Sequence, residues 1–295
     1  MLNKLLVWTL HLTCLHRVIW YFSKKRCITI ISYHNPDPVT FEKHIIFLSS
    51  CYSFISLDEL VQYLERREWG NLPSRPMILT IDDGYLSNHN LTAIIQKYRI
   101  PAMIYLTAGV IGTNRRFWWK SEGLTALENK KLKKMPDTER LILLESKYGH
   151  TNTRSYENIS TLSWNDVREW IRAGGQIGCH SMFHPILTKC SKEKAIDEIM
   201  QSQLVISKAL DLNCRHFAYP NGNWNDLVVS IVRTANYQTA RTSRHGWVTL
   251  NSDRFTLPVM GVSDDANLCK VILQVTGIWQ TFRTGKLPVF KKIKD

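Results

Sequence analysis

Apolar residues fall into two kinds of run along most of this chain. Short continuous runs rich in β-branched residues predict buried strands at 27–32, 77–81, 102–107, 176–179 and 216–219. Longer runs with apolar residues three or four positions apart predict helices at 40–50, 57–67, 86–98, 164–173, 192–210 and 226–234. Strands that alternate with helices form parallel sheets, and this number of units favours an α/β barrel over an open sheet.

The N-terminal segment, residues 1–26, does not belong to this alternation. Its apolar stretches are interrupted by Arg17 and are followed by a basic cluster at 24–26. A membrane-spanning helix needs about 20 mostly apolar residues, and a signal peptide needs a small-residue cleavage site, so neither pattern fits. We expect a helix that anchors the protein peripherally at the cytoplasmic face of the membrane, with a helix packed on the barrel as the alternative.

A second departure covers residues 109–160. This stretch contains two adjacent tryptophans, a lysine-rich segment and a segment rich in Ser, Thr and Asn. We interpret it as an insertion with some helix, and whether it covers the substrate stays open. The barrel with this insertion is expected to occupy residues 27–295.

The net charge indicates which kinds of molecule the protein binds, and the cysteines indicate in which cellular compartment it works. The formal net charge is +13 at pH 7, which favours anionic partners such as acidic lipids or acidic polysaccharides. The basic residues lie in small groups without a nucleic-acid-binding motif, so we expect no nucleic acid partner. The seven cysteines are scattered and include no C-x-x-C pair, which favours reduced thiols in a cytosolic protein over disulfides or structural zinc.

Polar residues follow three of the predicted strands, at the edge where α/β barrels carry their active sites. Asp82 and Asp83 follow the second strand, and two adjacent carboxylates repel each other unless a cation or a proton relieves them. His180 and His184 follow the fourth strand, and two neutral imidazoles at this spacing can bind one metal ion. The turn at 219–222 could direct backbone N–H groups at an oxyanion. The alternatives are ordinary turns and an incidental histidine pair.

Taken in order, the segments Thr80–Gly84, His180–Pro185 and Tyr219–Gly222 resemble the motifs of a known family. This is the polysaccharide deacetylase family, also called the NodB-homology or carbohydrate esterase family 4 domain. Its motifs read T-F-D-D-G, then H-[ST]-x-x-H-P, then a strand ending in P-[YN]-G. The resemblance covers residues 27–260 and implies an irregular barrel of about seven parallel strands. It also implies a metal-dependent hydrolase that removes acetyl groups from N-acetylated sugars of a polysaccharide or its lipid-linked precursor.

The resemblance assigns roles to the residues that match the motifs. Asp83, His180 and His184 would be the metal ligands, with zinc as the default ion and cobalt, nickel or iron as alternatives. Asp82 would be the general base, and the backbone N–H of Asn221 would help to stabilise the tetrahedral oxyanion.

This sequence departs from the family pattern in two places. The arginine that orients the base in the third motif is replaced by Ala218, and the late Leu-x-His that supplies the general acid has no counterpart after residue 250. Arg241 and Arg254 are both candidates for the missing arginine. His34 follows the first strand, as in a permuted subset of the family, and is the candidate acid; its alternative is a histidine that caps the strand or contacts only substrate.

Aromatic residues near the motifs are candidates for contact with sugar rings. We predict substrate binding by Tyr33, Tyr219 and Trp247, although aromatic residues are more often part of a core. The two departures also leave an alternative function, a catalytically impaired carbohydrate-binding protein on the same barrel.

Overall fold

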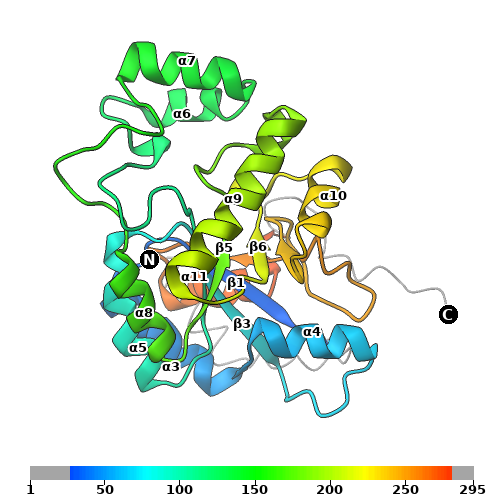
Figure 1. Ribbon diagram of the computed structural model, residues 1–295. Helices are drawn as coiled ribbons and strands as arrows, with labels where there is room; N and C mark the ends of the chain where they lie inside the picture. The colour runs from blue at the N-terminus through cyan, green and yellow to red at the C-terminus, as the bar shows by residue number, and fades with distance from the viewer. Residues whose placement is uncertain (1–26, 281–295) are drawn as a thin grey trace.

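The structure, a computed structural model, describes residues 27–280 (Figure 1). The predicted N-terminal anchor at 1–26 lies outside the described residues. Each helix within 27–280 is too short or too polar to cross a bilayer.

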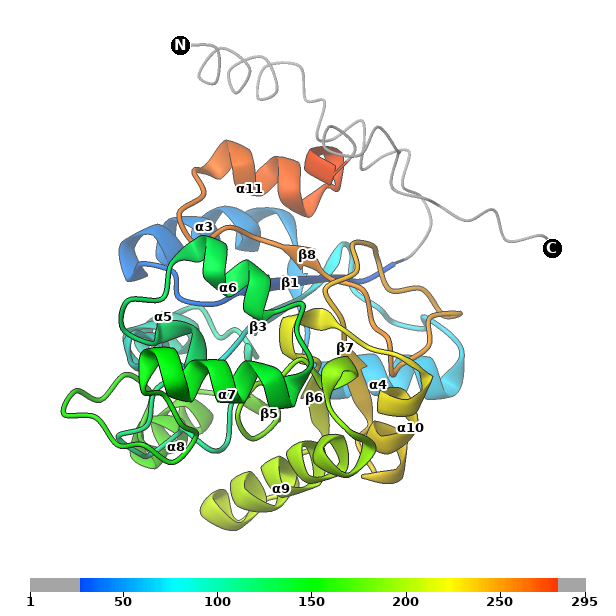
Figure 2. The ribbon, with the colours of Figure 1, turned by 90° about the horizontal axis from the view of Figure 1, so that it is seen from above.

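A curled sheet of parallel strands forms the centre of the molecule (Figures 1 and 2). Its main path runs β7-β6-β5-β4-β3-β1-β8, and β2 pairs with β3 beside it. The strands are β1 (Thr29–Tyr33), β2 (Ser53–Phe54), β3 (Pro76–Ile81), β4 (Met103–Leu106), β5 (Gln176–Cys179), β6 (His216–Ala218), β7 (Thr239–Arg241) and β8 (Met260–Gly261). Within the described chain no ladder joins β7 to β8, so the expected barrel is a curled half-barrel rather than a closed ring.

Helices flank this sheet; most lie in the connections between its strands, and α11 follows the last strand (Figure 1). They are α3 (Pro38–Cys51), α4 (Leu57–Arg66), α5 (Thr92–Lys97), α8 (Trp164–Arg172), α9 (Lys192–Leu210), α10 (Asp226–Thr234) and α11 (Leu268–Val275). Local sequence sets their starts: Ser56 and Glu59 form a capping box at α4, and Ser163 and Asp166 form one at α8. The helix predicted at 86–98 is divided into a 3₁₀ segment, η1 (Leu86–Leu91), and α5.

Side chains of β1 alternate between two core clusters, as the two-residue period of a strand requires. Ile30 packs with Ile78 and Met103 in one cluster. Ile31 and Tyr33 belong to the larger cluster, which the sheet forms with α3 and the other helices. Because the strands run parallel, the residues that follow them lie at one edge of the sheet.

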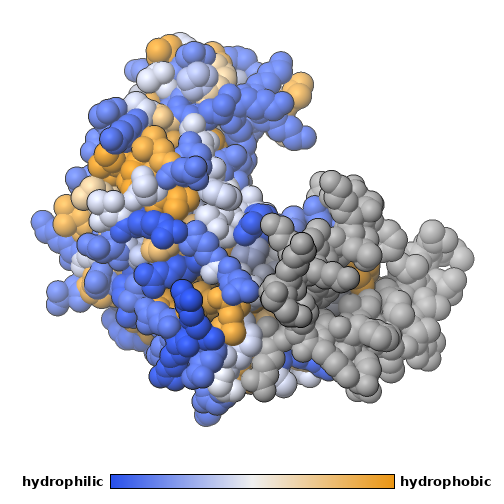
Figure 3. All heavy atoms as spheres, turned by 90° about the vertical axis from the view of Figure 1, so that its right-hand side faces the viewer, coloured by the Kyte–Doolittle hydropathy of each residue, from blue (hydrophilic) through white to orange (hydrophobic). Residues whose placement is uncertain are grey.

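Much of the segment 109–160 forms a lobe beside this edge, although Ile111 near its start packs in the main core. The lobe contains η2 (Trp118–Lys120), α6 (Ala126–Leu132) and α7 (Asp137–Tyr148), and it has a small core of Trp118, Leu132 and Leu144. It lies at the top of the molecule in Figure 1, and its surface is mostly hydrophilic in Figure 3. The lobe contacts the loops that follow β5 and β6, because Trp118 bonds to His184 and Lys133 bonds to Asn221.

Candidate metal and catalytic centre

The two adjacent carboxylates lie in a sharp turn at the end of β3. Asp83 and Gly84 have left-handed φ values of 76° and 84°, which bend the chain immediately after the strand. The left-handed φ favours glycine at position 84, and a Cβ there would lie 2.7 Å from Ile111 Cδ1, so the Ile111 side chain would also have to move. The turn leaves Asp82 and Asp83 pointing into the protein, where both are buried.

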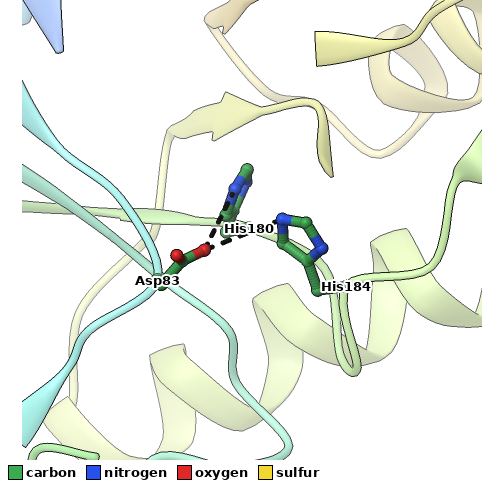
Figure 4. Close-up of side chains that lie close together, drawn as sticks. All are labelled: Asp83, His180 and His184. Carbon is green, nitrogen blue, oxygen red and sulfur yellow. Dashed lines mark ion pairs between the residues drawn. The ribbon is translucent and has the colours of Figure 1, made fainter. Parts of the chain in front are cut away.

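Asp83, His180 and His184 converge from two loops, as Figure 4 shows. The Oδ1 atom of Asp83 lies 3.6 Å from Nε2 of His180 and 3.7 Å from Nε2 of His184. Three donors that each lie about 2 Å from one ion are themselves roughly 3–4 Å apart, so the spacing suits a single metal ion. Clusters of exposed acidic groups are common in proteins without any metal ion. These three side chains are buried, so their grouping is of a different kind.

The hydrogen bonds around these three side chains also fit a cation. His180 Nδ1 lies 2.7 Å from the carbonyl oxygen of Ala218, so Nδ1–H donates there and Nε2 is left bare to face Asp83. Within residues 27–280, neither Asp83 Oδ1 nor His184 Nδ1 has a hydrogen-bond partner. Burial raises the pKa of Asp83 to about 7 and lowers the pKa of His180 to about 4. An anionic carboxylate beside neutral imidazoles is therefore unfavourable here until a cation is bound, and the residues present fit a divalent metal.

Hydrogen bonds from the lobe, from α9 and within the loop itself hold the loop that carries His184. Ser181 and His184 have φ values of 63° and 55°, and Ser181 Oγ accepts from the backbone N–H of His184 at 3.0 Å. From the lobe, Trp118 Nε1 donates to the carbonyl oxygen of His184 at 3.0 Å. From α9, the buried carboxylate of Glu198 accepts from the backbone N–H of Phe183 at 2.8 Å.

Asp82 is paired with Arg241, which comes from β7. Nη2 of Arg241 donates to both carboxylate oxygens, and both side chains are buried. Burial by itself raises the pKa of Asp82, but the positive charge of Arg241 and smaller contributions from His180 and His34 outweigh it and lower the pKa. The other candidate arginine, Arg254, pairs instead with Glu65 at 3.3 Å.

His34 approaches the same carboxylate from the loop after β1. Its Nε2 lies 3.8 Å from Oδ2 of Asp82, and its side chain is 56% exposed. The loop is tied to the segment after β8, because the backbone N–H groups of His34 and Asn35 donate to the two carboxylate oxygens of Asp264, each at 3.0 Å.

Asn221 lies in the turn after β6 with a left-handed φ of 55°. A Cβ on the next residue, Gly222, would lie 2.1 Å from Ser243 Oγ, so the turn packs closely on its neighbour. The side-chain oxygen of Asn221 accepts from Nζ of Lys133 at 3.0 Å. Burial lowers the pKa of Lys133, and the charge of Asp83 partly opposes this.

A cavity of about 650 Å³ joins these groups. Its wall includes all six residues predicted to be catalytic or metal-binding: His34, Asp82, Asp83, His180, His184 and Asn221. The three residues predicted to bind substrate are placed differently. Tyr219 lines the cavity, but its hydroxyl donates to the carbonyl oxygen of Phe255. Trp247 packs against the main core and does not line it.

Tyr33 does not reach the cavity, contrary to expectation. Its side chain is fully buried in the cluster beneath α3, and its hydroxyl pairs with His44 Nδ1 at 3.2 Å. The reason is the alternation of β1: Ser32 faces the cavity, so the next residue points to the opposite side of the strand.

Comparison with known proteins decides the family. The family profile described as polysaccharide deacetylase matches residues 70–240. This chain belongs to the polysaccharide deacetylase family. The predicted fold and enzyme class, a hydrolase of this family, are thereby confirmed.

Relatives of this polysaccharide deacetylase are found among curated proteins and solved structures. Poly-beta-1,6-N-acetyl-D-glucosamine N-deacetylase of Staphylococcus aureus strain MSSA476 is 25% identical over 254 residues, which cover 85% of this chain and 75% of the relative. The deacetylase PplD of Streptococcus pyogenes, solved with acetate, has a TM-score of 0.63 at 18% identity, with 85% of this chain and 99% of that chain covered. IcaB of Ammonifex degensii has a TM-score of 0.60 at 19% identity, and the match covers 85% of this chain and 97% of IcaB. The two structures share the fold of this deacetylase.

Several residues around the deacetylase site were not predicted from the sequence. Glu198 and Lys194 are four residues apart on α9, a spacing typical of an exposed ion pair, yet the Glu198 side chain is 1% exposed. Asp264 and Lys133 lie far from any motif and reach the site only through folding. Trp118 lies in the insertion at 109–160, and the adjacent pair of tryptophans is the one sequence signal at its position.

Proposed function

We propose that this polysaccharide deacetylase hydrolyses the acetamide groups of N-acetylglucosamine units in a polysaccharide, with a β-1,6-linked polymer as its substrate. The observation that carries the proposal is the buried Asp83, His180 and His184 set beside the Asp82–Arg241 pair in one cavity. Family membership and the printed activity of the staphylococcal relatives support the same substrate class.

The protein groups supply the proton transfers that amide hydrolysis requires. Water adds to the acetamide carbonyl carbon, and Asp82, held ionised by Arg241, accepts the proton that this water loses. The backbone N–H of Asn221 stabilises the oxyanion that forms. When the C–N bond breaks, the sugar nitrogen needs a proton, and His34 donates it. Acetate and a free amine are the products.

A divalent ion fits the geometry of Asp83, His180 and His184, and we propose zinc. Such an ion supplies Lewis acidity toward the acetamide oxygen and toward water. The fixed tautomer of His180 and the unpartnered oxygen of Asp83 support this assignment.

We also propose that the enzyme acts at the inner face of the membrane, where a lipid-linked saccharide precursor is a second possible substrate. The formal charge of +13 supports contact with an anionic surface. Sedimentation with vesicles that contain acidic lipids tests this proposal: binding that falls with salt supports it, and absence of binding at low salt contradicts it.

The test of the main proposal is release of acetate from β-1,6-linked N-acetylglucosamine oligomers by the full chain loaded with zinc or cobalt. We expect metal-dependent release that is lost in Asp82→Asn with metal content unchanged. Stoichiometric bound metal without release from any N-acetylated oligomer would contradict the assigned substrate class, and a protein that binds no metal would contradict the assigned centre.

A further inference from the structure

A second cavity, of about 710 Å³, adjoins the catalytic cavity. Asn35, Tyr85 and Lys120 line both cavities, so the two are adjacent and share part of their wall, and we call the pair the groove. Each cavity lies within the range of about 300–1,000 Å³ typical of ligand pockets. A chain of linked sugars that places one acetamide at the metal centre therefore has room for neighbouring units in the second cavity.

Three cations lie along this groove without an acidic partner. Lys133 and Lys120 line the catalytic cavity, and Lys120 and Arg116 line the second one. Within residues 27–280, none of the three takes part in an ion pair. Lys133 bonds to the neutral side chain of Asn221, Lys120 lies 5.6 Å from the ring centre of Tyr85, and Arg116 lies 4.1 Å from that of Tyr156.

The acidic residues of the groove are each engaged already. Asp82 is paired with Arg241, and Asp83 belongs to the metal set. Asp264 accepts two backbone N–H groups, and Asp166 lies 3.2 Å from His89. The linings of the two cavities thus hold four carboxylates and four cationic side chains, Arg241 included. A divalent ion bound at Asp83, His180 and His184 makes the charge that meets an incoming substrate positive.

The proposed reaction converts a neutral acetamide into an amine that takes up a proton near neutral pH. From the excess of positive charge we infer that Lys133 and Lys120 make this enzyme select sugar units whose neighbours are still acetylated, and reject units next to a free amine. This inference rests on the proposed function. It predicts a polymer in which the free amines are spaced apart rather than gathered in blocks.

The test compares two defined β-1,6-linked trimers at pH 6.5, one fully acetylated and one with a single free amine beside the target unit. We expect the wild-type enzyme to prefer the fully acetylated trimer by about tenfold in kcat/KM, the order of a like-charge repulsion across several ångströms of partly solvated groove. The preference should fall as the pH rises and the amine loses its proton.

Variants assign the preference to the lysines. The pair Lys120→Gln and Lys133→Gln should reduce the ratio of the two kcat/KM values to about twofold, because the repelling charge is gone. Lys133→Arg keeps the charge and should keep the ratio. Lys134→Gln, which changes an exposed lysine next to Lys133, is the matched control and should behave as wild type.

The outcomes separate this inference from the proposed function. Absence of acetate release from both trimers contradicts the proposed function itself. Release from both at equal rates by the wild-type enzyme contradicts the inference alone. If the preference persists in the double glutamine variant, or does not change with pH, the lysine charges are not its cause and the inference is wrong. The enzyme would then distinguish the trimers by the shape of the acetyl group.

Discussion

Ala218 and Arg241 are direct neighbours across the parallel strands β6 and β7. From that position Arg241 donates to both oxygens of Asp82, while the carbonyl oxygen of Ala218 accepts from His180. The family motif places the orienting arginine at position 218, so this chain supplies the same guanidinium from the next strand. The alanine is therefore no sign of a lost base, which weakens the alternative of an impaired carbohydrate-binding protein.

Arg241→Ala should reduce both activity and stability. Removing one partner of a buried ion pair costs about 3–5 kcal/mol in the free energy of unfolding, since the other charge stays buried. Loss of an oriented general base lowers kcat by about 10²–10⁴-fold. Acetate release and thermal unfolding measure the two effects. Adding Ala218→Arg should recover part of kcat if the guanidinium is what matters, whereas full activity in Arg241→Ala alone would rule out its positioning role.

Metal loading should stabilise the protein in a way that depends on Asp83. At a free metal concentration about 100 times Kd, binding adds about 2.7 kcal/mol to the free energy of unfolding. For a domain of this size that corresponds to a rise of roughly 5–10 °C in Tm. Differential scanning fluorimetry with zinc should show the rise for wild type and none for Asp83→Asn or His180→Ala. An equal rise in Asp83→Asn would place the ion elsewhere.

His34→Ala should impair amide hydrolysis much more than ester hydrolysis. A sugar amine leaves only with a proton, whereas a phenolate leaves without one, so an acid contributes only to the first reaction. We expect a loss of about 10²–10⁴-fold with N-acetylated oligomers and a small loss with 4-nitrophenyl acetate. Metal content, measured by atomic absorption, should not change. Equal losses on both substrates would indicate that His34 acts on binding or structure instead.

Asp58 should make stability depend on acid pH. It lies in the first turn of α4 and accepts from His216 at 3.0 Å, from Arg215 at 3.1 Å and from Gln176 at 2.7 Å. The hydrogen bond from His216 is the main cause that lowers its pKa in the folded state. At acid pH the unfolded chain thus binds a proton more readily, and the contribution of Asp58 is present above the unfolded pKa of about 3.9 and is lost as pH falls through the lower folded value.

Asp58→Asn should therefore lower the free energy of unfolding by about 1.5–3 kcal/mol at pH 7, the range for hydrogen bonds to a charged group. The difference from wild type should shrink below pH 4. Urea unfolding at a series of pH values measures it, with Asp265→Asn as control because that carboxylate is 90% exposed. A difference that stays constant down to pH 3 would mean that the charge of Asp58 contributes nothing.

The regular elements of this fold could be predicted where the apolar pattern is long or bounded by clear signals. The predicted bounds of β5, α9 and α10 agree with the structure. β7 and β8 have three and two residues, which is too short for any period to be visible, and they were missed. The partner of Asp82 could not be chosen between Arg241 and Arg254, because the choice depends on strand register that no local pattern encodes.

The candidate site was predictable to the extent that it lies in contiguous motifs. The six predicted residues come from the three motifs and from the loop after β1. They meet in one cavity because parallel strands end at the same edge of the sheet. Residues that reach this edge from elsewhere, such as Glu198, Asp264 and Lys133, carry no signal of their own. The prediction for Tyr33 was wrong because successive residues of a strand point to opposite faces of the sheet. The resemblance to the family motifs does not show which face a given residue takes.

Asp83, His184 and Asn221 all hold left-handed backbone conformations, with φ values of 76°, 55° and 55°. For residues other than glycine this conformation costs about 1–3 kcal/mol each, and the surrounding packing must outweigh it. At these three positions the backbone conformation that the site requires therefore lowers the stability of the fold. Selection of this enzyme for heat resistance alone would favour glycine there, and each such gain would remove a ligand or a contact of the cavity.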